Sequence, residues 1–224
     1  MERQKILPIS QASLWSPKGI KALTYLREVR HLSDEVIRKF QLGYCPRDEN
    51  HFLAGRILMP VFDAHGQLIA FSTRDYEATN GFKHWHESFD KSNYLYGLNI
   101  AKKHIQWNKQ AIVVEGQFDV TCLHSYDLPM TVGSCGTAFS IIHVAKLARY
   151  CSDFYFVLDD DEAGDAGVVN IMKMYQVYSL KSLGLNFIPV KLPNKLDPDE
   201  YVFKYGKASF TQILVKRKQE VLNV

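Results

Sequence analysis

A buried strand that ends in a run of acids constrains this 224-residue chain more than any other feature. Residues 154–158 read Phe-Tyr-Phe-Val-Leu, and residues 159–162 read Asp-Asp-Asp-Glu. A short apolar run of aromatic and branched residues predicts a strand inside a sheet. Acidic side chains directly after such a strand are costly unless a cation or solvent balances their charge. The segment therefore predicts a sheet edge that faces a cation or water.

The same pattern occurs earlier in the chain. Residues 111–114 form another short apolar run, Glu115 and Gly116 follow it, and Asp119 comes one helical turn later. Parallel strands carry their C-terminal side chains to one edge of the sheet, where open α/β sheets bind ligands. Alternate residues of an extended chain point the same way, so Asp159 and Asp161 can share one ion.

A third acidic group, Asp197–Pro198–Asp199, follows an expected strand over residues 187–190. Ligand sets made only of oxygen favour Mg²⁺ or Mn²⁺ over zinc. Carboxylates from three loops can hold two such ions, which is an arrangement that serves phosphoryl transfer. The predicted metal ligands are Glu115, Asp119, Asp159, Asp161, Asp197 and Asp199.

Each acidic group also has an ordinary structural interpretation. Glu115 and Gly116 can form a solvated turn, with Asp119 capping the helix that follows. The acids after residue 158 can begin a helix, because the helix dipole favours negative charge there. The Asp-Pro-Asp sequence is also common in turns. Three such groups that all follow strands favour the metal site over coincidence.

The rest of the chain predicts two kinds of architecture. After residue 110, strands and helices alternate, which indicates a parallel sheet with helices on its faces. Strands are expected at 111–114, 130–132, 154–158 and 187–190, and helices near 119–126, 140–150, 165–183 and 199–205, with another after Ala208. We therefore expect an α/β domain over 109–192 and a short helical segment over 193–224.

A smaller α+β subdomain is expected over residues 1–108. Its expected parts are an extended lead-in over 1–17, a helix over 18–30, a short helix capped by Ser33, a hairpin of 55–62 with 67–74, an irregular stretch over 75–96 and a helix near 99–106. Net charge differs between the two parts, at +5 for residues 1–110 and −2 for residues 111–224. A basic part beside an acidic one suits a polyanion held over a metal site, although ordinary surface variation explains the charges equally well.

Composition excludes several classes of protein. No apolar run is long enough to span a membrane, and the N-terminal residues show no signal-peptide pattern. The four cysteines are widely spaced and form neither a zinc motif nor a secreted disulfide framework. A reducing cytoplasm is the expected location.

The acidic motifs resemble those of a TOPRIM domain. The family has a strand–Glu–Gly turn and a later strand followed by Asp-x-Asp, matched here by residues 113–120 and 158–164. Residues 134–137, Ser-Cys-Gly-Thr, resemble the turn between these motifs, and Asp197–Pro198–Asp199 resembles the third acidic motif of bacterial primases. Residues 25–44, 55–74 and 91–98 resemble, in the same order, the region that precedes this core in DnaG-type primases.

The resemblance implies an RNA-polymerising primase core that makes short primers on single-stranded DNA from ribonucleoside triphosphates. It implies Glu115, Asp159 and Asp161 as catalytic residues, with two Mg²⁺ or Mn²⁺ ions as the cofactor. It also assigns the groove for template and nucleotide to basic residues, namely Arg56, Arg74, Lys83 and Lys91. The family further implies a replicative helicase and a separate zinc-binding module as partners, in the cytoplasm of a bacterial or phage-infected cell.

The chain departs from the family at several positions. Asp160 stands where glycine is usual, and Glu162 stands where a basic residue is usual. No zinc motif or helicase-binding region is recognised beside the core, which suggests a minimal, phage-like or truncated form. Two other functions use the same motifs: a TOPRIM nuclease or RNA-maturing enzyme, in which water attacks, and a non-catalytic nucleic-acid-binding replication module. The upstream resemblance disfavours the first, and the intact acidic motifs disfavour the second.

Overall fold

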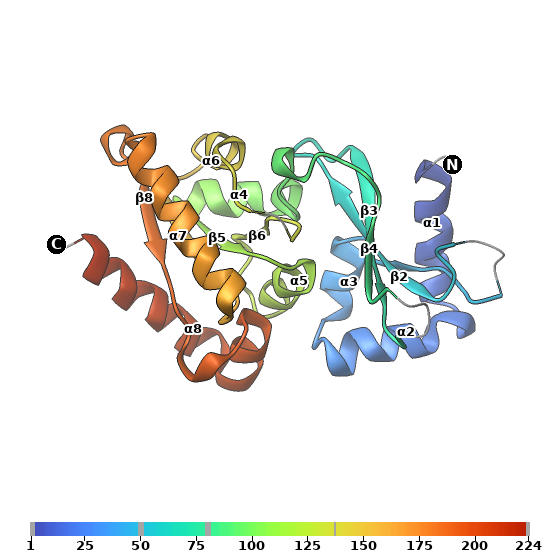
Figure 1. The fold of residues 1–224 in the computed structure, drawn as a ribbon. Coiled ribbons are helices and arrows are strands. Elements are labelled where there is room, and N and C mark those ends of the chain that lie inside the picture. Colours follow the sequence, from blue (N-terminus) through green and yellow to red (C-terminus); the bar gives the residue numbers. More distant parts are fainter. Residues whose placement is uncertain (1–2, 49–51, 79–81, 137, 223–224) are drawn as a thin grey trace. The chain divides into compact units, whose positions relative to one another are not determined.

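The computed structural model describes residues 3–48, 52–78, 82–136 and 138–222. The chain forms two compact units, Met1–Asp90 and Lys91–Val224 (Figure 1). The sequence placed the boundary between residues 108 and 109. The structure instead assigns helix α4 (Leu98–Asn108) to the second unit, where it contacts two strands of the parallel sheet.

The first unit is built on an antiparallel sheet with the strand order β1-β2-β3-β4. Its elements are α1 (Arg3–Leu14), α2 (Ile20–Thr24), α3 (Asp34–Lys39), β1 (Gly43–Tyr44), β2 (Arg56–Phe62), β3 (Leu68–Asp75) and β4 (His84–His86). A 3₁₀ turn (Pro17–Gly19) precedes α2, and a π-helical turn (Tyr25–Val29) follows it. The Ser33 hydroxyl accepts a hydrogen bond from the Val36 N–H, which confirms the predicted cap of α3.

The expected extended lead-in over residues 1–17 is wrong, because residues 3–14 form helix α1. Pro8 removes one backbone donor from this helix but does not end it. Tertiary packing compensates for that loss: Leu14 is fully buried, and Ile6 and Leu7 pack against the core cluster of Leu53, Leu58 and Phe71. Local propensity alone therefore missed a helix that the core stabilises.

The predicted hairpin is confirmed by strands β2 and β3. Its turn is held by Asp63, whose carboxylate accepts hydrogen bonds from the His65 and Gln67 N–H groups at 2.8 and 2.9 Å. The stretch expected to be irregular contains β4, which pairs with β3. Its strand pattern is hard to recognise because only one of its three residues, Trp85, packs on the core cluster, and a histidine lies on each side of it.

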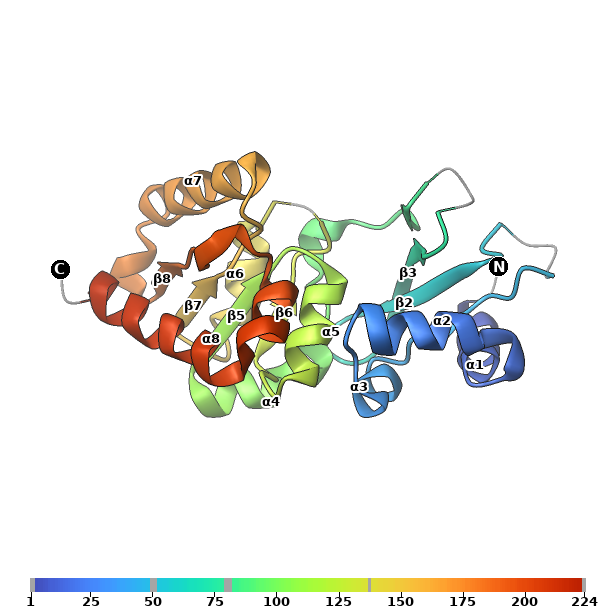
Figure 2. The same cartoon turned by 90° about the horizontal axis from the view of Figure 1, so that it is seen from below.

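The second unit contains a parallel sheet with the strand order β6-β5-β7-β8. Its elements are α4, β5 (Gln110–Val114), α5 (Gln117–Ser125), β6 (Thr131–Gly133), α6 (Ile141–Leu147), β7 (Asp153–Phe156), α7 (Glu162–Val177), β8 (Asn186–Pro189) and α8 (Pro198–Leu222). Figure 2 shows α7 on the opposite side of this sheet from α8. The predicted α/β fold with a parallel sheet is confirmed.

Buried aromatic residues form the centre of this second unit. Phe154 and Phe156 of β7 are fully buried, and the rings of Phe156 and Phe187 lie 4.9 Å apart. Helix α8 kinks at Gly206, where φ is +77°, between the two helices that the sequence predicted there. This core fixes the strand ends that carry the acidic residues.

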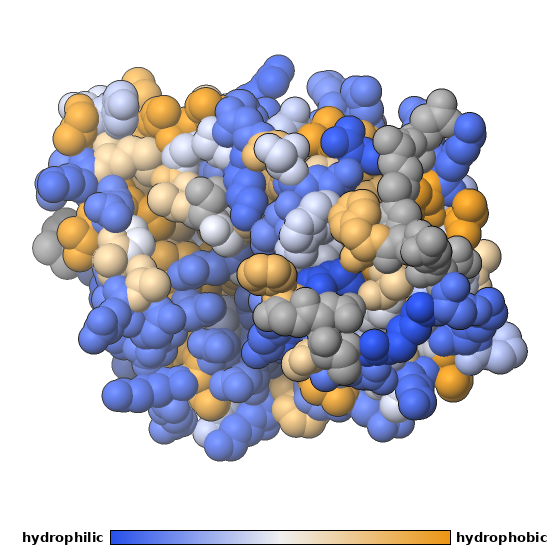
Figure 3. All heavy atoms as spheres, turned by 45° about the vertical axis from the view of Figure 1, so that its right-hand side comes forward, coloured by the Kyte–Doolittle hydropathy of each residue, from blue (hydrophilic) through white to orange (hydrophobic). Residues whose placement is uncertain are grey.

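In the described part of the chain, no helix is both long enough and apolar enough to cross a membrane. On the face shown in Figure 3, a mainly hydrophilic surface is interrupted by apolar patches. Large hydrophobic side chains that are exposed include Phe52, Phe82, Trp107 and Val177.

Candidate active site

Two neighbouring strands bring Glu115 and Asp159 together at the C-terminal edge of the parallel sheet. Strand β5 ends one residue before Glu115, and the Val157 N–H donates to the Val113 carbonyl at 3.0 Å, which extends the pairing beyond β7. The backbone N–H of Asp159 also hydrogen-bonds the Glu115 carboxylate and favours its charged form. The predicted meeting of these two loops therefore occurs in the structure.

Asp161 is the N-cap of helix α7. Its Oδ1 accepts a hydrogen bond from the Gly164 N–H at 2.7 Å, which satisfies one of the free donors of the first turn. Gly164 is required here, because a Cβ atom would lie 2.0 Å from the Asp159 carbonyl oxygen. The capping interpretation is thus correct for Asp161, and it leaves the second carboxylate oxygen available to another partner.

The third acidic loop joins the site through the backbone of Asp160. The Asp160 N–H hydrogen-bonds the Asp197 carboxylate, and the Asp197 carbonyl accepts from the Tyr201 N–H in the first turn of α8. Asp199 lies in the same turn and contributes to the electrostatic potential at Asp159. The sheet edge therefore gathers carboxylates from three loops, as predicted.

Burial and mutual repulsion raise the pKa of several of these acids. Burial is the main cause for Asp159, and Asp197, Glu115, Asp161 and Asp199 add to it, raising the pKa to about 7. Burial, with Asp161 and Asp197, also raises the pKa of Glu115, and burial with neighbouring acids raises that of Asp197. A site that makes its own carboxylates hard to ionise is one that a cation would stabilise.

The donor chemistry fits a divalent ion at this edge. The Oδ1 atom of Asp159 is buried and has no hydrogen-bond partner, so an acceptor oxygen is left over for a ligand. Among the described residues, however, no three His, Cys, Asp or Glu side chains are already arranged around one point as an ion would require. Holding an ion would thus require side-chain rotation in the acidic loops.

Asp119 is placed differently from the other predicted ligands. Its Oδ2 accepts a hydrogen bond from the Gly116 N–H at 3.1 Å, so Asp119 caps the start of α5. Only 9% of the residue is exposed. The structural role that the sequence allowed for Asp119 is therefore present, and its role as a metal ligand stays a prediction.

The predicted basic residues occupy contrasting environments. Arg56 is only 4% exposed, and its guanidinium donates to the Thr73 hydroxyl at 2.8 Å and to the Phe82 carbonyl at 2.7 Å. Lys83 is exposed. Lys91 belongs to the second unit, where its carbonyl hydrogen-bonds the His143 ring at 3.1 Å. Arg56 is thus held within the first unit, whereas Lys83 reaches solvent.

Arg74 lies at the centre of a basic cluster that sequence reasoning found only in part. Its guanidinium donates to the His84 ring and hydrogen-bonds Tyr25, and its Nε–H is buried without a partner. Burial, Arg74, Lys83 and Arg30 all contribute to lowering the His84 pKa to about 4. Arg30 was not predicted as a site residue, because the fold alone brings it to Arg74. Arg74, Arg30 and Lys83 thus bring positive charge together around a neutral His84, which suits a phosphate.

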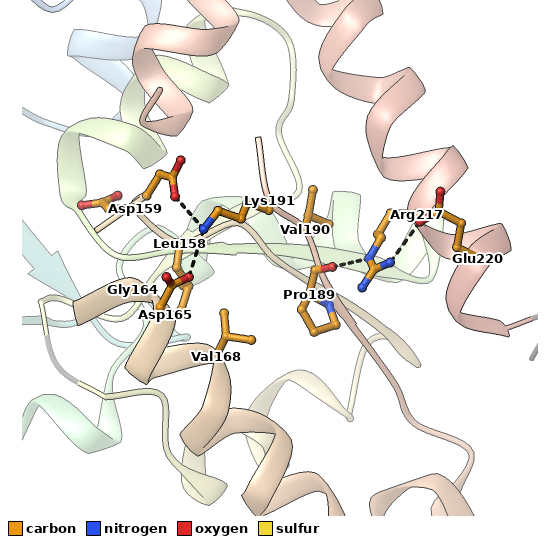
Figure 4. Close-up of a pocket in the computed structure, with 11 residues that line it drawn as sticks. Leu158, Asp159, Gly164, Asp165, Val168, Pro189, Val190, Lys191, Arg217 and Glu220 are labelled. Atoms are coloured by element: carbon orange, nitrogen blue, oxygen red, sulfur yellow. Dashed lines mark hydrogen bonds and ion pairs between the residues drawn. The ribbon is translucent and has the colours of Figure 1, made fainter. Parts of the chain in front are cut away.

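A cavity of about 460 Å³ adjoins the acidic edge. Figure 4 shows it between α7, the end of β8 and α8, with Lys191 and Arg217 among its lining side chains. The Arg217 Nε–H donates to the Pro189 carbonyl at 2.8 Å, and Lys191 forms ion pairs with Asp160 and Asp165. Sequence reasoning did not single out Lys191, which lies beyond β8 and is distant in sequence from both of its partners.

A parallel sheet in which Glu follows one strand and Asp-x-Asp follows its neighbour, with a third acidic pair at the start of α8, defines a TOPRIM-domain protein. Comparison with known families agrees: a model of Toprim-like domains matches residues 112–202. A model of the N-terminal domain of the DNA primase catalytic core matches residues 50–102. The chain therefore has the TOPRIM-containing core of DnaG-type primases, as its sequence resemblance implied.

Individual relatives support the same family. The chain is 30% identical to the DNA primase of Chlamydia trachomatis over 229 residues, which cover 88% of this chain and 38% of the relative. It is also 30% identical to the DNA primase of Synechococcus elongatus, covering 92% of this chain and 35% of the relative. The chain thus spans little more than a third of the curated relatives it matches.

Solved structures share the fold across nearly the whole chain. A DnaG catalytic core matches with a TM-score of 0.86 and 26% identity, covering 95% of this chain and 77% of that one. The Aquifex aeolicus primase with zinc-binding and RNA polymerase domains matches with a TM-score of 0.80 and 25% identity, covering 95% of this chain and 59% of that one. The two-unit architecture is therefore that of the primase core.

Proposed function

We propose that this chain is the RNA-polymerising core of a DNA primase, which synthesises short primers on single-stranded DNA by metal-dependent nucleotidyl transfer. The observation that carries the proposal is the set of carboxylates from three loops around the buried, unpartnered Asp159 oxygen. The primase relatives and a similar DnaG primase catalytic domain bound to single-stranded DNA support the choice of template.

In this proposal, Glu115, Asp159 and Asp161 hold the reacting groups at the sheet edge. Divalent ions, Mg²⁺ or Mn²⁺ and most simply two of them, would stabilise the negative charge of the transition state. Asp197 and Asp199 would complete the ligand set, and Asp119 would support it from α5. Because burial and nearby acids raise the pKa of Glu115, this carboxylate is suited to accept a proton from the attacking 3′-hydroxyl.

The reaction joins the 3′-oxygen of the primer to the α-phosphorus of a ribonucleoside triphosphate. The bond to the β-phosphate breaks, and pyrophosphate leaves with its electrons. No protein nucleophile is needed, since the hydroxyl attacks directly. Arg74 and Lys83 would hold phosphates on the first unit, and Lys91 would do so on the second. The replicative helicase and a zinc-binding module are the partners that the family resemblance implies.

A single incubation tests the function. The chain is mixed with single-stranded DNA, Mg²⁺ or Mn²⁺ and labelled ribonucleotides, and the products are separated by length. We expect label in short RNA, loss of that label in Asp159→Asn, and retention of it in Asp127→Asn, whose exposed carboxylate pairs with Lys207 elsewhere on the second unit. DNA cleavage would instead indicate a nuclease, and no product would indicate a binding module.

A further inference from the structure

Asp160 adds a carboxylate between two proposed metal ligands, at a position where the family resemblance has glycine. The backbone and the side chain of Asp160 have different partners. Its backbone N–H hydrogen-bonds Asp197 within the acidic cluster, whereas its side chain, only 10% exposed, forms an ion pair with Lys191 at 2.8 Å. The mostly buried carboxylate beside Asp159 is thus paired with a lysine.

Lys191 reaches this position from the end of β8. Its Nζ lies 2.8 Å from Asp160 and 3.2 Å from Asp165 of α7, and Figure 4 shows its side chain extending across the cavity wall toward the start of that helix. The lysine side chain is 63% exposed and the Asp160 side chain only 10%, so water reaches the pair mainly through the lysine. A mostly buried carboxylate that loses its cation keeps its charge close to the proposed ions.

We propose that Lys191 is a positioning residue for the metal site, which neutralises Asp160 so that its charge does not add to that of the ligand carboxylates. This inference rests on the proposed metal-dependent function. The Asp160 carboxylate is already engaged by Lys191 at 2.8 Å. Its effect on an ion is therefore electrostatic and acts without direct coordination.

The proposal predicts opposite effects from the two halves of the ion pair. Lys191→Met leaves an uncompensated negative charge and should tighten Mn²⁺ binding, roughly three- to tenfold at low ionic strength. Asp160→Asn leaves the lysine charge and should weaken binding by a similar factor. The double variant should return to within about twofold of the wild-type affinity, and Lys191→Arg should resemble wild type.

Mn²⁺ titration of the full chain, followed by electron paramagnetic resonance, measures these affinities without any turnover. Lys195→Met is the matched control, since it removes a lysine charge from the same loop while the Lys191–Asp160 pair stays intact. Circular dichroism establishes that each variant folds. If Lys191→Met does not fold, Asp160→Asn tests the proposal by itself. Weaker Mn²⁺ binding than in wild type supports the proposal, and unchanged Mn²⁺ binding overturns it.

The failures of the two proposals are distinguishable. Wild-type Mn²⁺ binding that Asp159→Asn leaves unchanged would overturn the proposed metal site, and the role of Lys191 with it. Wild-type binding that depends on Asp159 but is unchanged or weakened in Lys191→Met would overturn the role of Lys191 alone. Equal tightening in Lys195→Met would also overturn it, because the effect would then be a general one of surface charge.

Discussion

Metal binding at the acidic edge should depend on pH because Asp159 must lose a proton first. In the folded chain, burial and neighbouring carboxylates raise the pKa of Asp159 from 3.8 to about 7. An ion competes with that proton, so binding releases protons and strengthens as the pH rises. The perturbation is therefore a simple change of pH between 6 and 8.

The expected magnitude follows from the ionised fraction of Asp159. With a pKa of about 7, roughly a tenth of the carboxyl is ionised at pH 6 and roughly nine tenths at pH 8. The apparent Mn²⁺ affinity should therefore rise about tenfold over this range. With an unperturbed carboxyl of pKa near 4, the affinity would change by only about 1%.

Isothermal titration calorimetry measures the Mn²⁺ affinity at each pH. Repeating the titration in buffers that differ in ionisation enthalpy gives the number of protons released on binding. Asp159→Asn should bind Mn²⁺ more weakly and with a much flatter pH dependence. Asp127→Asn is the control and should behave like wild type, since that carboxylate is exposed and lies in a surface ion pair. An affinity that is constant from pH 6 to 8 in wild type would refute the reasoning.

Three further predictions follow from the same contacts. In chelator, the folded chain holds a proton on Asp159 that the unfolded chain releases near pH 3.8, so stability should fall as the pH rises through about 7. Between pH 5 and the folded pKa of about 7, about two pH units correspond to about 3 kcal/mol, which solvent screening reduces to about 1 kcal/mol; urea unfolding at pH 5 and 8 should show this loss, and Asp159→Asn should lessen it. Arg74→Ala should lower the salt slope of single-stranded DNA binding by about one unit while Lys39→Ala leaves it unchanged, and equal slopes in both would place Arg74 outside the interface. Gly164→Ala should abolish primer synthesis with the chain still folded, because its Cβ would displace the Asp159 carbonyl at 2.0 Å, and full activity would show that the loop adapts.

The parallel-sheet unit was predictable because its strands are short, apolar and followed at once by acids. Residues 111–114 and 154–158 carried both the fold and the site in one local pattern. Parallel pairing then placed Glu115 beside Asp159 without further information, since strand ends of neighbouring parallel strands share an edge. At these positions the apolar run and the acids that follow it both indicate a buried strand that ends at a sheet edge, which is why the parallel sheet was predicted correctly.

Elements stabilised by distant contacts were not predictable in this way. Helix α1 contains Pro8 and depends on packing against residues far along the chain. Strand β4 is formed by residues whose partners lie in β3, and its histidines give no apolar alternation. The same holds for Lys191, whose role arises only when β8 brings it to Asp160 and Asp165. The burial of Arg56 likewise depends on the Phe82 carbonyl, which local sequence does not reveal.

The central claim is that the carboxylates at the sheet edge form the metal site of a nucleotidyl transferase. Crystals of the full chain soaked with Mn²⁺ and a ribonucleoside triphosphate test it most directly, by anomalous diffraction at the manganese edge. We expect anomalous peaks within coordination distance of Glu115, Asp159 and Asp161, with the triphosphate oxygens completing the shell. Peaks confined to other acidic groups, or a triphosphate bound away from this edge, would contradict the claim.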